Sequence, residues 1–415
     1  MLKIAIVTTR YLQSDMRGNE EIAKNLAEGL NNYHDITVIT SNALDSFAIK
    51  GMPLIGRYLN YEGERKINNI RVIYFPVTPI IGGWISALSR LLKKIFSTRM
   101  YSLPIDISNT MGFGPFSIRM FLHLMYERYD LIYSSAYPTT TSFLALIAAL
   151  KTHTPFVFTP FYHYKLEEFN KSRTFKYIIS KSTAIIACTE KERTELMKKG
   201  ATSEQLFTVP LGINSSKIDV RKSDFLMLSK KLDLNGKFII LANPWQSKGI
   251  NTLLKALSEL SRKYNNLALL TIGNPDSEYL KIRKKMMNAS NLIIKDLGWV
   301  TGKLKWECFA ICDVFVMPSI SDAFGLSYLE AWVMRKPVIG LSGTSAEDLI
   351  KNGINGFLIK KGDSQMLEKY LEVLILSPEL KTSLGKAGRK FLTSKYTLNR
   401  FIAEYKSIFE KVGVK

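Results

Sequence analysis

Two successive series of short apolar runs, alternating with amphipathic helical patterns, constrain this chain more than any other feature. Apolar runs bounded by polar loops are typical of strands buried in a parallel sheet. Between runs, Ile22, Leu26 and Leu30 lie on one face of a helix. Strands alternating with helices predict a parallel sheet with right-handed crossovers and helices on both faces. The runs of the first series lie at 4–8, 36–40, 71–75, 130–134, 155–159 and 183–187.

The second series repeats the scheme after a Pro- and Gly-containing boundary at 209–214. Because 415 residues exceed what one hydrophobic core supports, we expect two domains. The predicted fold class is α/β, with two Rossmann-like, doubly wound parallel-sheet domains. We expect an N-terminal domain over 1–212, a C-terminal domain over 213–395, and a helix over 396–415 that packs back on the N-terminal domain. The second-series strands are expected at 238–242, 267–272, 292–295, 314–317 and 337–340.

The overall composition limits the classes of partner and the cellular compartment that we expect, but it does not indicate a specific function. The formal net charge of +21 attracts polyanions, whether nucleic acid, anionic lipid or phosphorylated substrates. No nucleic-acid-binding module is recognisable, so we expect no nucleic-acid partner. The three cysteines are irregularly spaced, which fits a reducing compartment. The N-terminus shows no signal-peptide pattern, and no apolar segment reaches roughly 20 residues. We therefore expect a cytoplasmic protein.

The stretch 318–331, Pro-Ser-Ile-Ser-Asp-Ala-Phe-Gly-Leu-Ser-Tyr-Leu-Glu-Ala, is the most informative local sequence. It follows a predicted strand and leads into a helix, so it lies at the carboxyl edge of a sheet, where open α/β sheets bind ligands. Gly325 permits close backbone approach, and the following amides suit an anion. Asp322 and Glu330 are eight residues apart and bracket one ligand if the helix starts after Gly325.

This stretch resembles the signature Pro-Ser-x-x-Glu-x-Phe-Gly-x-x-x-x-Glu-Ala of the family 4 retaining glycosyltransferases. The resemblance implies the GT-B fold, two Rossmann-like domains facing a central cleft, and sugar transfer from a nucleotide-diphosphate sugar. Further matching segments follow in order: Gly18, the Thr-Pro-x-x-His segment ending at His163, 209–214, Lys248-Gly249, Gly-Trp-Val at 298–300, and 352–357.

The resemblance also implies roles for individual residues. Lys248, Asp322, Glu330 and His163 form the catalytic set, in which Lys248 neutralises the diphosphate and Glu330 binds the donor ribose. Asp322 and His163 would lie near the sugar, and His163 also near the acceptor. The predicted donor-binding residues are Gly18, Asn243, Val300, Phe324, Gly325 and Leu326, with Arg17 as a further phosphate contact.

The sequence departs from the family pattern at four places. Only Gly18 remains of a glycine pair, and Asn243 stands where the family has an arginine. Asp322 replaces a glutamate, and Arg335 replaces a glycine that ends the signature helix. Losing the arginine removes one of two phosphate cations, which should weaken leaving-group stabilisation unless Arg17 or another basic residue substitutes.

Simpler interpretations stand beside these roles. Asp322 is also a preferred helix N-cap, Lys248 a surface lysine before a helix, and Glu330 a solvated helix acid. For the whole protein, the alternatives are a GT-B sugar phosphorylase, a nucleotide-sugar epimerase, or a catalytically impaired subunit that acts in donor binding or as a scaffold. No Asp-x-Asp metal motif lies in a suitable loop, so we expect no metal and no cofactor beyond the nucleotide-sugar co-substrate.

The segment 84–96 has two interpretations. An apolar stripe from Trp84 to Phe96 lies opposite Arg90, Lys93 and Lys94, the pattern of a basic helix at an anionic membrane surface. The same pattern describes an ordinary helix packed on its sheet. The family resemblance favours a glycan or lipid-linked acceptor, which would bring the protein to the inner face of the cell membrane as a peripheral protein.

Overall fold

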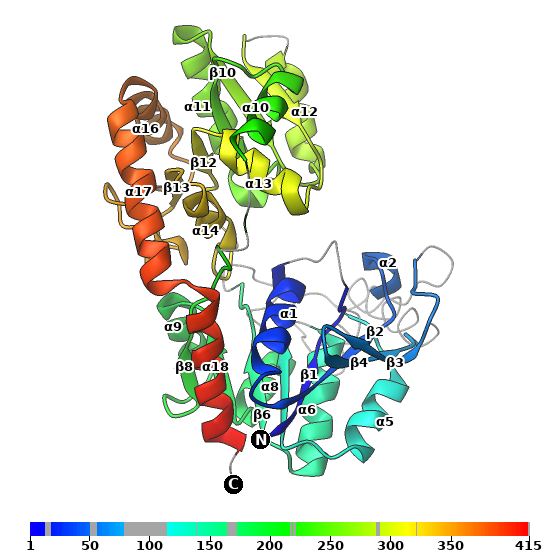
Figure 1. Cartoon of the computed structure of the whole chain (residues 1–415). Coiled ribbons are helices and arrows are strands. Elements are labelled where there is room, and N and C mark those ends of the chain that lie inside the picture. Colours follow the sequence, from blue (N-terminus) through cyan, green and yellow to red (C-terminus); the bar gives the residue numbers. More distant parts are fainter. Residues whose placement is uncertain are drawn as a thin grey trace, which may run out of the picture. The chain divides into compact units, whose positions relative to one another are not determined.

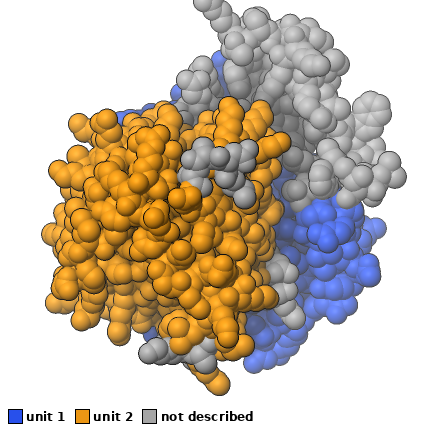
Figure 2. Space-filling model, turned by 90° about the horizontal axis from the view of Figure 1, so that it is seen from above, with its two compact units in different colours: residues 1–210, 399–415 blue, residues 211–398 orange. Residues whose placement is uncertain are grey.

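In the computed structural model, the chain folds into two compact units (Figures 1 and 2). Unit 1 comprises residues 1–210 and 399–415, and unit 2 comprises residues 211–398. The structure describes residues 1–12, 18–49, 56–78, 114–137, 139–163, 172–215, 218, 221–287, 291–320 and 322–413. The segment 84–96 and Arg17 lie outside the described residues.

Unit 1 is built on an eight-stranded sheet with the order β3-β4-β2-β1-β5-β6-β7-β8. All neighbours pair in parallel except β3, which the sequence analysis missed and which runs antiparallel to β4 at the edge. Four of the five residues of β3 are exposed, so the strand lacks the apolar run that marks the others. The strands are β1 (Lys3–Val7), β2 (Asp35–Ser41), β3 (Gly63–Ile67), β4 (Ile70–Phe75), β5 (Leu131–Ser135), β6 (Phe156–Thr159), β7 (Ala184–Ala187) and β8 (Leu206–Thr208).

Helices cover both faces of this sheet. Ser117, Thr139, Ser172 and Thr189 cap α5, α6, α8 and α9 through side-chain oxygens that accept backbone N–H groups. The last helix, red in Figure 1, returns to unit 1, where the hydroxyls of Tyr405 and Thr159 lie 2.8 Å apart. The helices are α1 (Gly18–Leu30), α2 (Ser46–Ile49), α5 (Ile118–Tyr126), α6 (Thr140–Thr152), α8 (Arg173–Lys181), α9 (Glu190–Lys198) and α18 (Leu398–Gly413).

Unit 2 contains a six-stranded, all-parallel sheet with the order β11-β10-β9-β12-β13-β14. Numbered within the unit, this is the 3-2-1-4-5-6 order of a doubly wound Rossmann sheet. The chain order therefore reverses between β9 and β12, which are neighbours. The strands are β9 (Phe238–Ala242), β10 (Leu267–Thr271), β11 (Ile293–Asp296), β12 (Val314–Val316), β13 (Val338–Leu341) and β14 (Phe357–Ile359).

Two helical layers enclose this second sheet. Alternate strand residues such as Ile240 join the apolar stripes of α11, α12 and α16 in one core cluster. On the other face, the ring of Phe315 contacts Phe309 of α13 and Tyr328 of α14. The helices are α10 (Lys222–Lys231), the 3₁₀ turn η1 (Gln246–Lys248), α11 (Ile250–Lys263), α12 (Ser277–Met287), α13 (Gly302–Ile311), α14 (Leu326–Val333), α15 (Ala346–Leu349), α16 (Ser364–Leu376) and α17 (Pro378–Lys395).

The expected architecture of two doubly wound α/β domains is confirmed. Across the described helices of both units, none combines the length and apolar character that crossing a bilayer requires.

Arg335 occupies a strained position directly after α14. Its φ of 54° is left-handed, and the Lys336 amide donates to the carbonyl of Ala331, which is the pattern of a helix end that favours glycine. The turn has little room to relax, because a Cβ on Gly385 of α17 would lie 1.9 Å from the Arg335 carbonyl oxygen. Arginine in place of the family's glycine at position 335 therefore affects local stability.

We expect Arg335→Gly to raise the free energy of unfolding of unit 2 by about 1 kcal/mol, because a left-handed L-residue is strained by about that amount. Urea-induced unfolding checks this. Arg335→Ala is the matched control, since it removes the charge but keeps the Cβ in the left-handed conformation. Equal gains in both variants would show that charge, and not backbone strain, sets the effect.

Candidate functional site

The loops that follow β9 and β12 in unit 2 are joined directly at the point where the strand order reverses. The amide of Ile320 donates to the carbonyl of Ser247 at 3.0 Å. Gly249 adopts φ 83°, and a Cβ there would lie 2.5 Å from the carbonyl oxygen of Pro318. Only glycine fits this approach, so the Lys248-Gly249 pair is built against the signature loop. In open α/β sheets this switch point is where ligands bind.

Lys248 and Asp322, predicted separately from motifs 74 residues apart, meet at this point. The Lys248 Nζ lies 2.5 Å from Asp322 Oδ1, and about a fifth of each side chain is exposed. The Asp322 carbonyl accepts a 2.7 Å hydrogen bond from the buried Ser345 hydroxyl, which fixes the loop. The site therefore presents a half-buried ammonium with a carboxylate as its counter-ion.

The N-terminus of α14 opens at the same edge. Its N-cap is Gly325, at φ 102°, and no side chain caps it. The alternative interpretation of Asp322 as a plain N-cap of this helix is therefore wrong. The first amides of a helix have no partner within it, so an uncapped N-terminus suits a phosphate. Beneath it, the hydroxyl of buried Tyr328 donates to the Met317 carbonyl, and Phe324 packs edge-on against Tyr396.

Glu330 lies on the second turn of α14 and pairs with a residue that the sequence analysis missed. Its Oε1 lies 2.8 Å from the Nζ of Lys305 on α13, and only 14 % of the Glu330 side chain is exposed. The interpretation of Glu330 as a solvated helix acid is therefore wrong. No local pattern marks Lys305, because the pair spans 25 residues and two helices.

The remaining predicted donor residues of unit 2 lie in neighbouring loops. The Asn243 Oδ1 is buried without a hydrogen-bond donor among the described residues. Gly273 makes room for this side chain, since a Cβ there would lie 2.8 Å from Asn243 Nδ2. The Gly273 amide donates to the Gly298 carbonyl at 2.6 Å, which brings Val300 and the half-exposed Trp299 to the same end of the sheet.

In unit 1, Gly18 is the first residue of α1 and is exposed. A buried ion pair fixes this end of the helix: the Nη2 of Arg10 lies 2.6 Å from Glu20 Oε1, and Arg10 Nη1 donates to the Leu44 carbonyl. The sequence analysis did not identify the structural role of Arg10 or of Glu20. The position of Gly18 is therefore set by a salt bridge beneath the first turn.

His163 is half-buried and lies in the loop that follows β6, four residues after the last strand residue, Thr159. It has an interaction partner. The backbone before it is held by Glu192, a fully buried residue of α9. One carboxylate oxygen of Glu192 accepts from the Tyr162 amide at 2.6 Å, and the other accepts from the Cys188 amide at 2.7 Å. Burial raises the pKa of Glu192 to about 7, although both hydrogen bonds act to lower it.

This raised pKa predicts a pH dependence of stability. The folded state holds the Glu192 proton up to about pH 7, whereas the unfolded state releases it near 4.5. The contribution of Glu192 to stability is therefore complete below pH 4.5 and is lost as pH rises towards 7.

We expect the stability cost of Glu192→Gln to shrink between these pH values, by up to about 1.4 kcal/mol per pH unit, because the amide does not ionise. Parallel urea unfolding of the wild type and the variant at several pH values measures this. A cost that stays constant or grows with pH contradicts the predicted titration.

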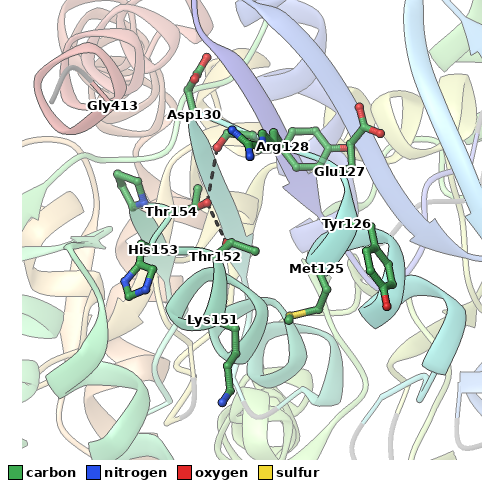
Figure 3. A pocket seen from close by; sticks show the side chains of 12 residues that line it. Met125, Tyr126, Glu127, Arg128, Asp130, Lys151, Thr152, His153, Thr154 and Gly413 are labelled. Atoms are coloured by element: carbon green, nitrogen blue, oxygen red, sulfur yellow. Dashed lines mark hydrogen bonds between the residues drawn. The ribbon is translucent and has the colours of Figure 1, made fainter.

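A pocket of about 690 Å³ lies at the opposite, amino edge of the unit 1 sheet (Figure 3). It is lined by residues 125–130 and 151–155, which precede β5 and β6, and by Gly413. None of the predicted site residues lines it. Among the residues that the structure describes, no group of three or more His, Cys, Asp or Glu side chains is arranged to hold a metal ion.

Comparison with known proteins decides the family. The model of Glycosyltransferase Family 4 matches residues 16–217, and that of Glycosyl transferases group 1 matches residues 229–391. The chain belongs to the family 4 glycosyltransferases. The capsular polysaccharide biosynthesis glycosyltransferase CapM of Staphylococcus aureus is 28% identical over 243 residues, spanning 55% of this chain and 61% of that relative.

Solved structures show the GT-B fold for this glycosyltransferase. Anabaena Alr3699/HepE in complex with UDP-glucose is similar with a TM-score of 0.72 at 16% identity, over 99% of this chain and 100% of that one. Sucrose-phosphate synthase from Thermosynechococcus elongatus is similar with a TM-score of 0.73 at 16% identity, over 99% of each chain. The GT-B fold expected from the signature is therefore confirmed.

Proposed function

We propose that this glycosyltransferase moves a sugar from a nucleotide-diphosphate sugar to a glycan or lipid-linked acceptor, with retention of anomeric configuration and without a metal. The observation that carries the proposal is the junction of Lys248, Asp322 and the uncapped N-terminus of α14 at the switch point of unit 2. A cation and open amides gathered at one sheet edge suit a diphosphate.

In the proposed reaction the bond between the anomeric carbon and the diphosphate oxygen breaks, and the acceptor oxygen bonds to that carbon from the same face. The departing phosphate takes the acceptor proton, so no nucleophilic side chain is required. Lys248 and the first amides of α14 stabilise the negative charge that grows on the leaving group, typically a large catalytic contribution. Lys248 thereby performs the task that a divalent cation performs elsewhere.

The pairing of Lys248 with Asp322 adds a step to donor binding. A diphosphate that reaches Lys248 competes with the carboxylate of Asp322 for the ammonium. The carboxylate of Asp322 then becomes available to the sugar hydroxyls. In unit 1, Gly18 and His163 would complete the site, with the Gly18 amide at the phosphate and His163 near the transferred sugar and acceptor.

Glu330 would accept hydrogen bonds from the donor ribose hydroxyls. Its contact with Lys305 leaves one carboxylate oxygen, Oε2, outside that ion pair. The neighbouring Val300 and Trp299 would border the nucleobase.

The proposed acceptor follows from the capsular polysaccharide role named for the relative CapM and from the net charge of +21. A basic protein is attracted to the anionic lipids of the inner membrane face, where lipid-linked acceptors are found. We propose a cytoplasmic location with peripheral membrane contact through the segment 84–96. No nucleic-acid partner is proposed.

The test is a screen of nucleotide-diphosphate sugars, starting with UDP-glucose, that detects release of free nucleoside diphosphate in the presence of a chelator. Release with an unchanged anomeric configuration in the product, read by NMR, is the expected result. A sugar phosphorylase or an epimerase would turn over without net nucleoside diphosphate release. Failure to bind any nucleotide sugar in calorimetry would favour the scaffold alternative.

A further inference from the structure

The buried carboxylate of Glu192 in unit 1 takes no part in the mechanism above. Glu192 is 0% exposed, and its two oxygens accept the amides of Tyr162 and Cys188. Taking a carboxylate out of water is unfavourable, so its retention in a core calls for a specific reason.

Local capping explains only half of this arrangement. Thr189 caps the start of α9, where the Glu192 amide donates to the Thr189 hydroxyl at 3.0 Å, and the Glu192 carboxylate accepts from the Cys188 amide just before this cap. The bond to Cys188 belongs to the same helix end. The bond to Tyr162 does not, because Tyr162 precedes Glu192 by 30 residues and follows a different strand. Glu192 therefore ties the exit of β6 to the exit of β7.

The segment that Glu192 holds is the one that leads into His163. Phe161, with φ 48°, adopts a left-handed conformation that a non-glycine residue avoids unless its surroundings enforce it. Tyr162 is fully buried, and its ring lies 4.7 Å from that of Phe175. The Tyr162 amide then reaches Glu192, so both side chain and backbone of the residue before His163 are fixed.

We propose that Glu192 is a positioning residue that fixes the 161–163 turn and so presents the His163 side chain to the transferred sugar and acceptor. The inference rests on the proposed role of His163. How rigidly Glu192 holds the 161–163 turn can be measured independently of that role.

The variant E192Q tests this with little change in volume. Above about pH 7, where Glu192 is ionised, an amide offers one acceptor oxygen in place of two, so one of the two backbone N–H groups loses its partner. We expect the Tyr162 bond to be lost, because the Cys188 bond is local to the helix end. The turnover number should fall about tenfold or more, since a misplacement of about 1 Å costs on the order of 100-fold. Donor affinity should stay unchanged, because Lys248, Asp322 and Glu330 lie in unit 2.

The matched control is E190Q, at the exposed first position of the same helix, which should leave turnover unchanged. A double-mutant cycle with H163A then separates positioning from stability. If Glu192 acts through His163, E192Q costs no further activity in the H163A background. An equal loss in both backgrounds overturns the positioning role. Wild-type activity of H163A itself overturns the proposed role of His163.

NMR of the histidine ring carbons provides a readout that is independent of activity. The chain has four histidines, so four Cε1 resonances can be assigned by single substitution. E192Q should shift or broaden the His163 resonance and leave those of His34, His123 and His153 in place. An unmoved His163 resonance overturns the proposal even if activity falls.

Discussion

Replacing Glu330 by alanine is expected to lower kcat/KM for sugar transfer roughly 100-fold or more while the fold stays intact. In its proposed role, Glu330 accepts hydrogen bonds from the two ribose hydroxyls of the donor. Hydrogen bonds to a charged group contribute about 1.5–3 kcal/mol each. The loss should be visible as weaker nucleotide binding in calorimetry and as slower release of nucleoside diphosphate. Circular dichroism and the unfolding midpoint report on the fold.

The contact between Glu330 and Lys305 requires a control. If Glu330 serves only as the counter-ion of Lys305, then Lys305→Met should reduce transfer as much as Glu330→Ala does. The account predicts a smaller effect for Lys305→Met, below about tenfold, because Lys305 orients the carboxylate without touching the donor. Unimpaired transfer by Glu330→Ala would refute the assignment of the ribose site.

Replacing Lys248 by methionine is expected to lower kcat about 100- to 1000-fold, the range observed when one charge-stabilising donor is removed from an active site. Methionine keeps much of the side-chain length and removes the ammonium. The charge on the diphosphate grows as the glycosidic bond breaks, so the loss should appear mainly in kcat. Single-turnover kinetics with saturating donor measure the chemical step directly.

Two further variants serve as controls for Lys248→Met. Lys255→Met removes an exposed lysine from α11 of the same unit and should leave kcat unchanged. Asp322→Asn removes the other member of the ion pair. If Lys248 only stabilises the loop through that pair, the two single variants should lose activity equally. A kcat for Lys248→Met that matches Lys255→Met would contradict a role at the leaving group.

The fold could be predicted from sequence because its signals are local. Buried parallel strands require consecutive apolar residues, and the run at 238–242 coincides with β9. Helix α14 begins at Leu326, as the expected start after Gly325 requires. The edge strand β3 was missed because its Glu64, Arg65 and Lys66 face solvent, so no apolar run marks it.

The contacts of the site could not be predicted, because they join residues that are distant in sequence. Neither hydrophobic periodicity nor motif spacing encodes the pairing of Glu330 with Lys305 or of Lys248 with Asp322. Glu192 had a readable signal in the Thr-x-x-Glu spacing that it shares with Thr189, which is typical of a capping box. That signal predicts a local helix cap and gives no indication of the second bond, to Tyr162. The left-handed conformation of Arg335 likewise depends on how α17 crosses the turn.

Hydrogen–deuterium exchange of the full chain, with and without the nucleotide sugar that supports turnover, tests whether the donor binds at the switch point of unit 2. We expect slower exchange in 243–250 and 318–330, where the loops after β9 and β12 meet. Exchange should stay unchanged in 125–130 and 151–155, around the pocket at the amino edge of unit 1. Slowing confined to that pocket, or no slowing in the two loops of unit 2, would contradict a donor site at the switch point.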